Sequence, residues 1–414
     1  MARTDVIVLG AGMVGTSIAV HLAKRGLAVA LIDRRGPGEE TSYGNAGVLE
    51  GNTLLPHPFP AGVMAFLEVV FKQTATVNYH LLDLPRTLPW VLDYRRNSAW
   101  EKRKQFATTM RPLFERAIAE HEALMSEVGA TKYLRKEGWL KVYRSQAAYD
   151  GIKRELDLAS QYGLEFRALD TDQALALEPW LKPVFKRAIH WPGAATVTNP
   201  LAVTRAYAAR FTALGGVMVN GDAGSLHRSG TNWRIETDGG SLDAEQSVVA
   251  LGPWAPDLLA RFDIKLPLGI KRGYHRHFTP QGNTGLTRAV VDTDNGYCLA
   301  PMEQGIRLTT GAEFADRDAA PTPVQFDRLM PAARELFPLG PQVNEPTWLG
   351  RRPCFADSRP VIDRAPGQAG MWMAFGHAHW GLTLGPATGR LLGEMMTGAT
   401  PFCDPAPYSA ARFR

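Results

Sequence analysis

Cysteine is scarce in this chain of 414 residues, which holds three of them. Cys298, Cys354 and Cys403 are odd in number and far apart, so they fit neither a disulfide framework nor the paired spacing of a zinc site. Disulfides accumulate in oxidising compartments, and the lack of a framework favours a reducing one. We therefore expect a cytoplasmic protein with no bound metal.

Long apolar runs and a large charge excess are also lacking. After the amino-terminal segment the most apolar stretch is 59–71, which holds Pro60 and Glu68 and is shorter than the roughly 20 residues that cross a bilayer. The net charge of +5 comes from 46 basic and 41 acidic residues and is too small to indicate nucleic acid binding. Peripheral contact with the inner face of a membrane stays open.

The strongest pattern lies at the amino terminus. An apolar run at 6–9 predicts a buried parallel strand, and Gly10, Gly12 and Gly15 follow it in the spacing G-x-G-x-x-G. A helical pattern comes next, and a second apolar strand ends at Asp33. In such a unit the glycines allow a tight turn, close approach of a pyrophosphate and close helix–strand packing. The helix amino terminus attracts the anion and the acid can bind a ribose, so the segment predicts a dinucleotide site.

The order of the remaining patterns indicates two interleaved domains. Apolar spacing predicts helices within 81–130, 147–162, 200–214 and 323–338, and strands at 138–143, 166–169, 217–219, 233–237, 241–244, 247–251 and within 265–315. We expect an α/β, Rossmann-type domain from 1–60, 190–255 and 345–414. An α+β domain with an antiparallel sheet and helices, made of 61–189 and 256–344, would be inserted into it and would bind the substrate.

Further segments carry a more specific signal. They are ETSYGNAG at 40–47, VVALGPWAPDLL at 248–259, KRGYHRHF at 271–278, GRRPCFADSRPVID at 350–363 and GHAHWGLTLGPATGRLL at 376–392. Because of these segments and the glycine unit, the chain resembles the FAD-dependent amine and amino-acid oxidoreductases of the D-amino-acid oxidase type. Within them it is most similar to bacterial D-amino-acid dehydrogenases, whose helical insert resembles 83–98. The resemblance implies that the amino-terminal unit and the carboxy-terminal glycine turn meet around one FAD.

The resemblance also assigns residues to that cofactor. The first glycines would hold the pyrophosphate and Asp33 the ribose, while loop 41–47 would run toward the isoalloxazine ring. A helix beginning near Pro386 would stabilise negative charge on the reduced flavin. The assigned residues are Gly10, Ala11, Gly12, Val14, Gly15, Asp33, Arg34, Thr41, Ser42, Asn45, Ala46, Gly47, Ala223, Gly252, Trp254, Gly376, Gly381, Leu382 and Thr383. Relatives that anchor FAD covalently have a cysteine near Gly350; here Cys354 comes four residues later, so we expect non-covalent FAD.

Five residues are implied at the substrate. Arg352 matches the position that grips the substrate carboxylate, a task that suits the planar fork of arginine. Strand alternation places Tyr274 and Arg276 on one face and His275 and His277 on the other, and we favour Tyr274 and Arg276 as cavity-lining. His377 and His379 flank the flavin turn, where each is a candidate for substrate contact or for a structural hydrogen bond. Tyr297 is a weaker candidate.

The implied reaction is oxidative deamination of a D-amino acid. Hydride passes from Cα to flavin N5, and the imino acid is then hydrolysed to a 2-oxo acid. This chemistry needs a positioned substrate and a dry cavity, and it needs no protein nucleophile. D-hydroxyproline, D-proline, glycine and sarcosine remain alternative substrates. The bulky Trp380, which the resemblance implies near the flavin ring, leaves the size of the substrate open. The electron acceptor is left open between a quinone, an electron-transfer protein and O₂.

Overall fold

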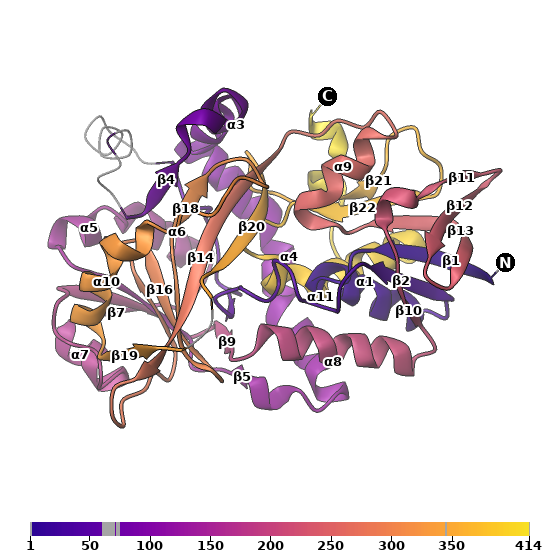
Figure 1. Ribbon diagram of the computed structural model, residues 1–414. Helices are drawn as coiled ribbons and strands as arrows, with labels where there is room; N and C mark the ends of the chain where they lie inside the picture. Colours follow the sequence, from indigo (N-terminus) through magenta and orange to yellow (C-terminus); the bar gives the residue numbers. More distant parts are fainter. Residues whose placement is uncertain (1, 60–70, 72–74, 344–345, 414) are drawn as a thin grey trace.

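The computed structural model describes residues 2–59, 71, 75–343 and 346–413, and within them two bodies, each built on its own large sheet, lie side by side (Figure 1). The apolar stretch 59–71, where membrane contact was left open, lies almost wholly outside these residues. No helix of the described chain is both long and apolar enough to span a bilayer.

The first sheet is of Rossmann type. Its parallel strands are β10 (Val217–Asn220), β2 (Val29–Asp33), β1 (Ala2–Leu9), β13 (Gly240–Val249) and β22 (Met371–Phe375), in that order. Antiparallel strands β12 (Asn232–Thr237) and β11 (His227–Ser229) extend it beside the first half of β13, and β21 (Val361–Arg364) pairs with β22. The sheet thus takes strands from three distant parts of the chain.

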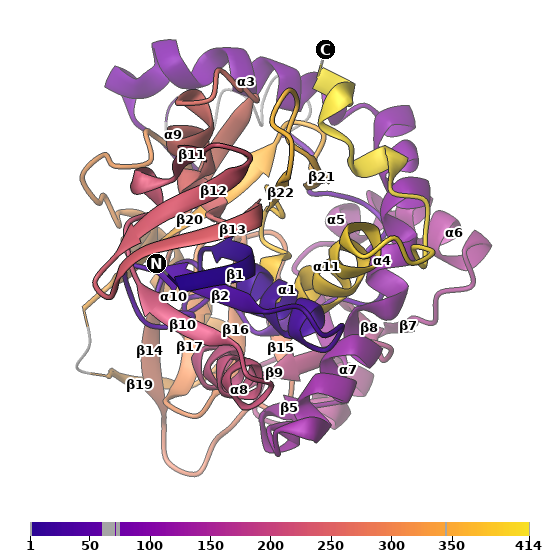
Figure 2. The ribbon, with the colours of Figure 1, turned by 90° about the vertical axis from the view of Figure 1, so that its right-hand side faces the viewer.

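Helices cover both faces of this sheet (Figure 2). On one face lie α1 (Met13–Ala23), α4 (Trp100–Glu127), α8 (Pro200–Ala213) and α11 (Gly381–Met396), and on the other α9 (Ala255–Ala260). In β1, Val6 and Val8 pack against the four-helix side, whereas Ile7 and Leu9 pack on the side of α9. A strand buried on both faces reads as a continuous apolar run, which is why β1 was recognisable from the sequence.

Helix α11 crosses α1 at a distance that only glycine allows. A Cβ atom at Gly385 would lie 2.6 Å from the Met13 side chain, and one at Gly389 would lie 2.7 Å from the Ser17 backbone. These contacts hold the carboxy-terminal helix against the helix of the glycine unit.

Helix α11 begins at Gly381, not near Pro386, which lies inside it. A proline has no N–H, so the carbonyl of Leu382, four residues earlier, lacks its helical donor. The imidazole Nε2 of His121, on α4, lies 2.7 Å from that oxygen and replaces the missing donor. A buried histidine thus allows the helix to start five residues earlier than we expected.

The second sheet has eleven strands in the described chain. They are β4 (Val77–Tyr79), β18 (Ala312–Phe314), β14 (Leu268–Pro280), β17 (Gly305–Thr309), β16 (Tyr297–Met302), β15 (Ala289–Asp292), β6 (Trp139–Tyr143), β8 (Arg187–Trp191) and β7 (Arg167–Leu169), with β19 (Leu339–Gln342) and β20 (Trp348–Phe355) also on β14. Helices α7 (Thr171–Leu177) and α10 (Gln325–Leu336) pack on one face and α6 (Lys153–Gln161) on the other. Strands β3 (Val48–Leu49), β9 (Ala195–Val197) and β5 (Leu134–Arg135) form a separate three-stranded sheet.

Four boundaries differ from the sequence expectation. The helical region 81–130 breaks into α3 (Leu84–Asn97) and α4 because Ala99 adopts an extended backbone, and 147–162 divides into α5 (Gln146–Asp150) and α6. The strands expected at 241–244 and 247–251 are one strand, β13. Because β20 pairs with β14, the chain beyond residue 345 first completes the second sheet and returns to the first only at β21.

The contact between α1 and β1 provides a test of this packing. A Cβ at Gly15 would lie 1.8 Å from the carbonyl oxygen of Gly10. Alanine is otherwise favoured over glycine in a helix by about 1 kcal/mol, yet we expect Gly15→Ala to lower the free energy of unfolding by about 1–3 kcal/mol because of this overlap. Denaturant unfolding measures it.

The matched control is Gly193→Ala, whose Cβ would meet no atom within 4 Å. We expect that variant to stay within about 0.5 kcal/mol of the parent. A Gly15→Ala protein as stable as the parent would contradict the packing of α1 on β1.

Candidate active site

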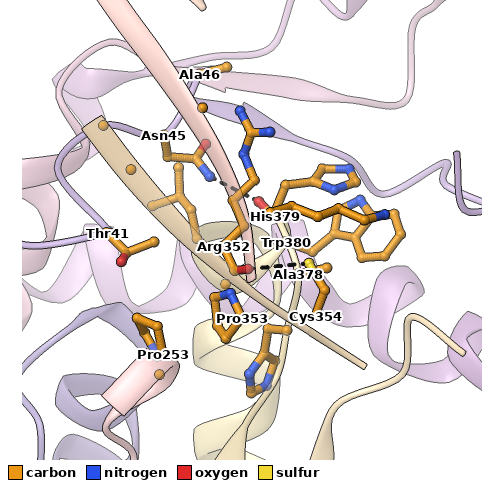
Figure 3. A pocket seen from close by; sticks show the side chains of 18 of the residues that line it. Thr41, Asn45, Ala46, Pro253, Arg352, Pro353, Cys354, Ala378, His379 and Trp380 are labelled. Carbon is orange, nitrogen blue, oxygen red and sulfur yellow. Dashed lines mark hydrogen bonds between the residues drawn. The ribbon is translucent and has the colours of Figure 1, made fainter. Parts of the chain in front are cut away.

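A cavity of about 910 Å³ lies between the two sheets and is lined by residues of both. This volume is near the upper end of the range of about 300–1,000 Å³ found for ligand sites. Gly10 and Gly12 line it from the amino-terminal unit, and Gly376, Gly381 and Leu382 from the carboxy-terminal turn. The two regions therefore meet at one cavity, as we expected. Figure 3 shows part of it, with Thr41 and Pro253 toward one end and His379 and Trp380 toward the other.

The glycine turn forms one end of the cavity. Gly10 has φ +102°, and a Cβ there would lie 2.6 Å from the carbonyl oxygen of Ala250, so the turn requires glycine. Gly12 is the N-cap of α1 and has no side-chain cap. The amide of Met13 donates to Ser42 Oγ at 2.9 Å, which ties loop 41–47 to the helix amino terminus. The turn has the geometry of an anion-binding helix start.

Asp33 is held firmly at the end of β2. Its Oδ2 accepts a hydrogen bond from the Ala11 amide at 2.7 Å, and Oδ1 accepts one from the Arg35 amide at 2.9 Å. A carboxylate oxygen can accept more than one bond, so both remain able to receive a ribose hydroxyl.

A group of aromatic and cationic side chains lies next to this end. The guanidinium of Arg34 lies 5.4 Å from the ring centre of Trp254, and that of Arg317 lies 5.9 Å from it. Ala223 and Gly252 line the cavity beside them. Of these residues, Arg34, Ala223, Gly252 and Trp254 line the cavity and are among those that the resemblance assigns to the cofactor.

Loop 41–47 runs along the cavity and is fixed by contacts with three distant segments. Thr41 Oγ1 donates to the Arg351 carbonyl at 3.2 Å, and Asn45 Nδ2 donates to the His379 carbonyl at 3.0 Å. Arg307, which the sequence did not single out, donates to the carbonyls of Tyr43 at 2.9 Å and Asn45 at 2.5 Å. The loop therefore joins two strands of the second sheet to the carboxy-terminal turn.

Four residues assigned to the cofactor lie behind the cavity wall instead of on it. The Ala11 amide donates to Asp33, and Gly15 lets α1 pack closely on the turn after β1, as described above. The Gly47 amide donates to Asn45 Oδ1 at 2.8 Å, and Thr383 Oγ1 donates to the Val48 carbonyl at 3.1 Å. These four residues position the wall.

Arg276 requires a correction. Its guanidinium lies 4.2 Å from the ring centre of Phe326 on α10, its Nε donates to Thr347 Oγ1 at 2.7 Å, and it is absent from the cavity wall. The opposite face of β14, which carries Lys271, Gly273, His275 and His277, points toward Arg352 and loop 41–47. The sequence showed the alternation correctly, but not which face α10 covers.

Tyr274 reaches the cavity, but its hydroxyl is already bound. It donates to Glu313 Oε1 at 2.8 Å and accepts from the Thr322 amide at 2.7 Å and from Arg272 at 3.2 Å. Burial raises the pKa of Tyr274 above its ordinary value. Tyr297 also lines the cavity, and its hydroxyl donates to the Ala332 carbonyl at 3.2 Å. Both phenols are therefore structural groups with rings at the wall.

Arg352 is a cation at the cavity with no acidic partner among the described residues. Its Nη1 donates to the Gly311 carbonyl at 3.1 Å and its Nη2 to that of Thr310 at 3.3 Å. A Cβ at Gly273 would lie 2.4 Å from Nη2, so the guanidinium lies across that glycine. Burial lowers the pKa of Arg352 below its ordinary value. An anion in the cavity would compensate this half-buried charge.

His377 and His379 differ in their surroundings. His377 Nε2 lies 3.0 Å from Thr388 Oγ1, and burial lowers its pKa to about 3. His379 has its ring 5.3 Å from that of His57, and burial together with nearby positive charge holds its pKa well below the ordinary value. Ala378 between them has φ +53°, which alanine rarely adopts and which often marks a functional turn. Both histidines line the cavity, but His377 is held by Thr388, whereas His379 lies beside His57 and Glu50.

The sequence did not single out Glu50, Lys141 or Lys271, which line the same part of the cavity. Glu50 Oε1 lies 3.7 Å from His379 Nε2, and 15% of its side chain is exposed. Burial raises the pKa of Glu50, while the charge of Lys141 opposes that rise. No motif marks Glu50 or Lys141, but Lys271 could have been found by choosing the other face of β14.

These features fit a dinucleotide with a planar ring system. The α1 turn offers backbone amides with no side chain at Gly12, and Asp33 stands at the following strand. The amino terminus of α11, also without a side-chain cap, adjoins the cavity at Gly381. Its partial positive charge favours an electron-rich group there.

Comparisons with known proteins agree with this geometry. Among curated relatives, a D-amino-acid oxidase of Bradyrhizobium diazoefficiens is 29% identical over 99% of this chain and 98% of its own length. A D-amino acid dehydrogenase of Chromohalobacter salexigens is 27% identical over 99% of both chains.

Solved structures share the fold at lower identity. Glycine oxidase of Geobacillus kaustophilus superposes with a TM-score of 0.76 at 23% identity, covering 100% of this chain and 99% of its own. L-proline dehydrogenase of P. horikoshii has a TM-score of 0.74 at 17% identity, covering 100% and 98%. The family model described as FAD dependent oxidoreductase matches residues 5–395, and the chain therefore belongs to this family of FAD-dependent enzymes.

Proposed function

We propose that the protein catalyses the oxidative deamination of a D-amino acid. The observation that carries this proposal is Arg352, a half-buried guanidinium at the cavity. Its bonds to two carbonyls leave three of its five N–H donors without a partner among the described residues. An α-amino acid offers the planar carboxylate that such a fork binds. The names of the full-length relatives, D-amino-acid oxidase and D-amino acid dehydrogenase, support the same substrate class.

The bound FAD supplies the acceptor for the electron pair that leaves the substrate Cα. The chain's own residues would orient the substrate, with Arg352 fixing the carboxylate and Trp380, packed between Phe106 and Phe114, closing one wall. Most of the surface that lines the cavity is apolar, which limits the water near the reacting atoms. Hydrolysis of the released imino acid then gives a 2-oxo acid and ammonia.

The substrate amine must be neutral before Cα is oxidised, and Glu50 is placed to take its proton. Its carboxylate accepts a hydrogen bond from Thr53 Oγ1 and lies beside the ring of His379, which is held neutral. Burial raises the pKa of Glu50 toward neutral pH, and a general base works best when its pKa lies near the working pH.

Non-covalent binding of FAD belongs to the same proposal. Gly350 has no reactive group, and the buried Cys354 thiol donates to the Arg352 carbonyl at 3.4 Å. Burial raises the pKa of that thiol, which keeps it protonated and unreactive.

Anaerobic addition of amino acids to the yellow holoprotein tests the reaction class. Loss of flavin absorbance with D-amino acids and not with their L-enantiomers is the expected result. Faster reduction by D-proline, D-hydroxyproline, glycine or sarcosine would move the substrate class to those amines. Under air, the yield of hydrogen peroxide separates an oxidase from a dehydrogenase.

Removal of Arg352 tests carboxylate binding. We expect Arg352→Ala to raise KM by about 10- to 100-fold, since a hydrogen bond to a charged group contributes about 1.5–3 kcal/mol. Bound flavin should be retained. Arg351→Ala is the matched control, because Arg351 bonds the Arg317 carbonyl and lies outside the cavity wall. An unchanged KM in Arg352→Ala would exclude Arg352 from this role.

A pH profile tests Glu50. As pH falls through the raised pKa, Glu50 becomes protonated and cannot accept a proton, so kcat/KM should fall on the acid side. In Glu50→Gln we expect the midpoint of that limb to move upward, toward the pKa of the free amine, and kcat/KM at neutral pH to drop by about 100-fold. Glu122→Gln, on the surface of α4, is the control. An identical profile for Glu50→Gln would remove Glu50 from proton transfer.

A further inference from the structure

Two cations stand directly opposite each other on neighbouring strands at the cavity. Lys271 on β14 and Arg352 on β20 are register partners, so their side chains lie on the same face of the sheet. Both line the cavity. Like charges directly opposite each other destabilise a sheet, so this pair calls for compensating negative charge.

Lys271 is held in position without an acidic partner among the described residues. Its ammonium lies 3.4 Å from the ring centre of Tyr94 and 5.5 Å from that of Trp90. The two rings stack on α3 with centres 5.3 Å apart, and Trp90 Nε1 donates to the Cys354 carbonyl at 3.0 Å. Aromatic faces favour a cation, but they carry no net charge that could neutralise it.

The other charged groups in this part of the cavity do not balance the pair. The positive charge of Lys141 opposes the rise in the pKa of Glu50, which is the acid it acts on. Glu155 is taken by Arg103 at 2.6 Å. Burial and the surrounding cations lower the pKa of His57 to about 3, so it adds no charge. Lys271 and Arg352 therefore present two positive charges to whatever occupies the space before them.

We propose that the substrate carries a second acidic group and is a D-amino acid of the aspartate or glutamate class. This inference rests on the proposed function. Arg352, with three donors in a planar fork, binds the α-carboxylate, and Lys271 binds the side-chain carboxylate. A single carboxylate shared by both cations would leave one of their two positive charges uncompensated at the cavity wall.

The test compares each acid with the amide of the same shape. For the FAD-loaded enzyme we expect kcat/KM for D-aspartate or D-glutamate to exceed that for D-asparagine or D-glutamine by at least about 10-fold, a difference of about 1.4 kcal/mol. Lys271→Met should abolish this preference, Lys271→Arg should retain most of it, and the exposed Lys265→Met should leave it unchanged.

Three outcomes would overturn the inference. The first is that the parent enzyme shows no preference for the acids, and the second is that Lys271→Met leaves the preference intact. The third is that Lys271→Met lowers kcat/KM for acids and amides equally, which would place Lys271 on the α-carboxylate. In each of these cases D-amino acids still reduce the flavin, so the proposed function stands.

A binding measurement covers the case in which no D-amino acid reduces the flavin, which would refute the proposed function itself. Titration with succinate and with butyrate, followed by the flavin spectrum, measures the affinity of the cavity for two carboxylates and for one. We expect tighter binding of succinate, lost in Lys271→Met. Equal affinities in the parent protein would contradict the two-cation site independently of turnover.

Discussion

The close crossing of α1 and α11 is the contact on which the rest of the structure depends. Gly385 and Gly389 let α11 approach Met13 and Ser17, and this brings the two ends of the chain to one cavity. The turn that precedes α11 is thereby placed opposite the glycine turn of β1. Without that approach, the family's cofactor would have a pyrophosphate site at one end but no wall for its ring system.

The second sheet is attached to this core through β14 and β20. Their pairing carries Lys271 and Arg352 to the cavity, while β21, which follows β20, returns to the first sheet. Arg307 and Asn45 tie the same region to loop 41–47 and to the His379 carbonyl. The groups proposed to bind the substrate are thus fixed to the same loop and turn that border the proposed cofactor site, so that positioning can supply much of the catalysis.

The sequence predicted the parts of the site that depend on local pattern. The glycine unit and Asp33 could be found because a phosphate turn that follows a strand needs those residue types at fixed spacing. Arg352 and the turn at 376–382 carry no such spacing signal and were identified only through the resemblance to the D-amino-acid oxidase type of enzyme. Arg276 was misplaced because alternation defines two faces and only the packing of α10 decides between them. Glu50 and Lys141 carry no spacing signal, since their roles arise from strands far apart in the chain. The start of α11 was missed because the donor that compensates for Pro386 is His121, on another helix.

A crystal structure of the protein with FAD and a small carboxylate inhibitor tests the central claim most directly. The account predicts the pyrophosphate against Gly12 and Met13, the ring system between loop 44–46 and the turn at 376–382, and the inhibitor carboxylate on Arg352. A cofactor bound outside this cavity, or a carboxylate held away from Arg352, would contradict it.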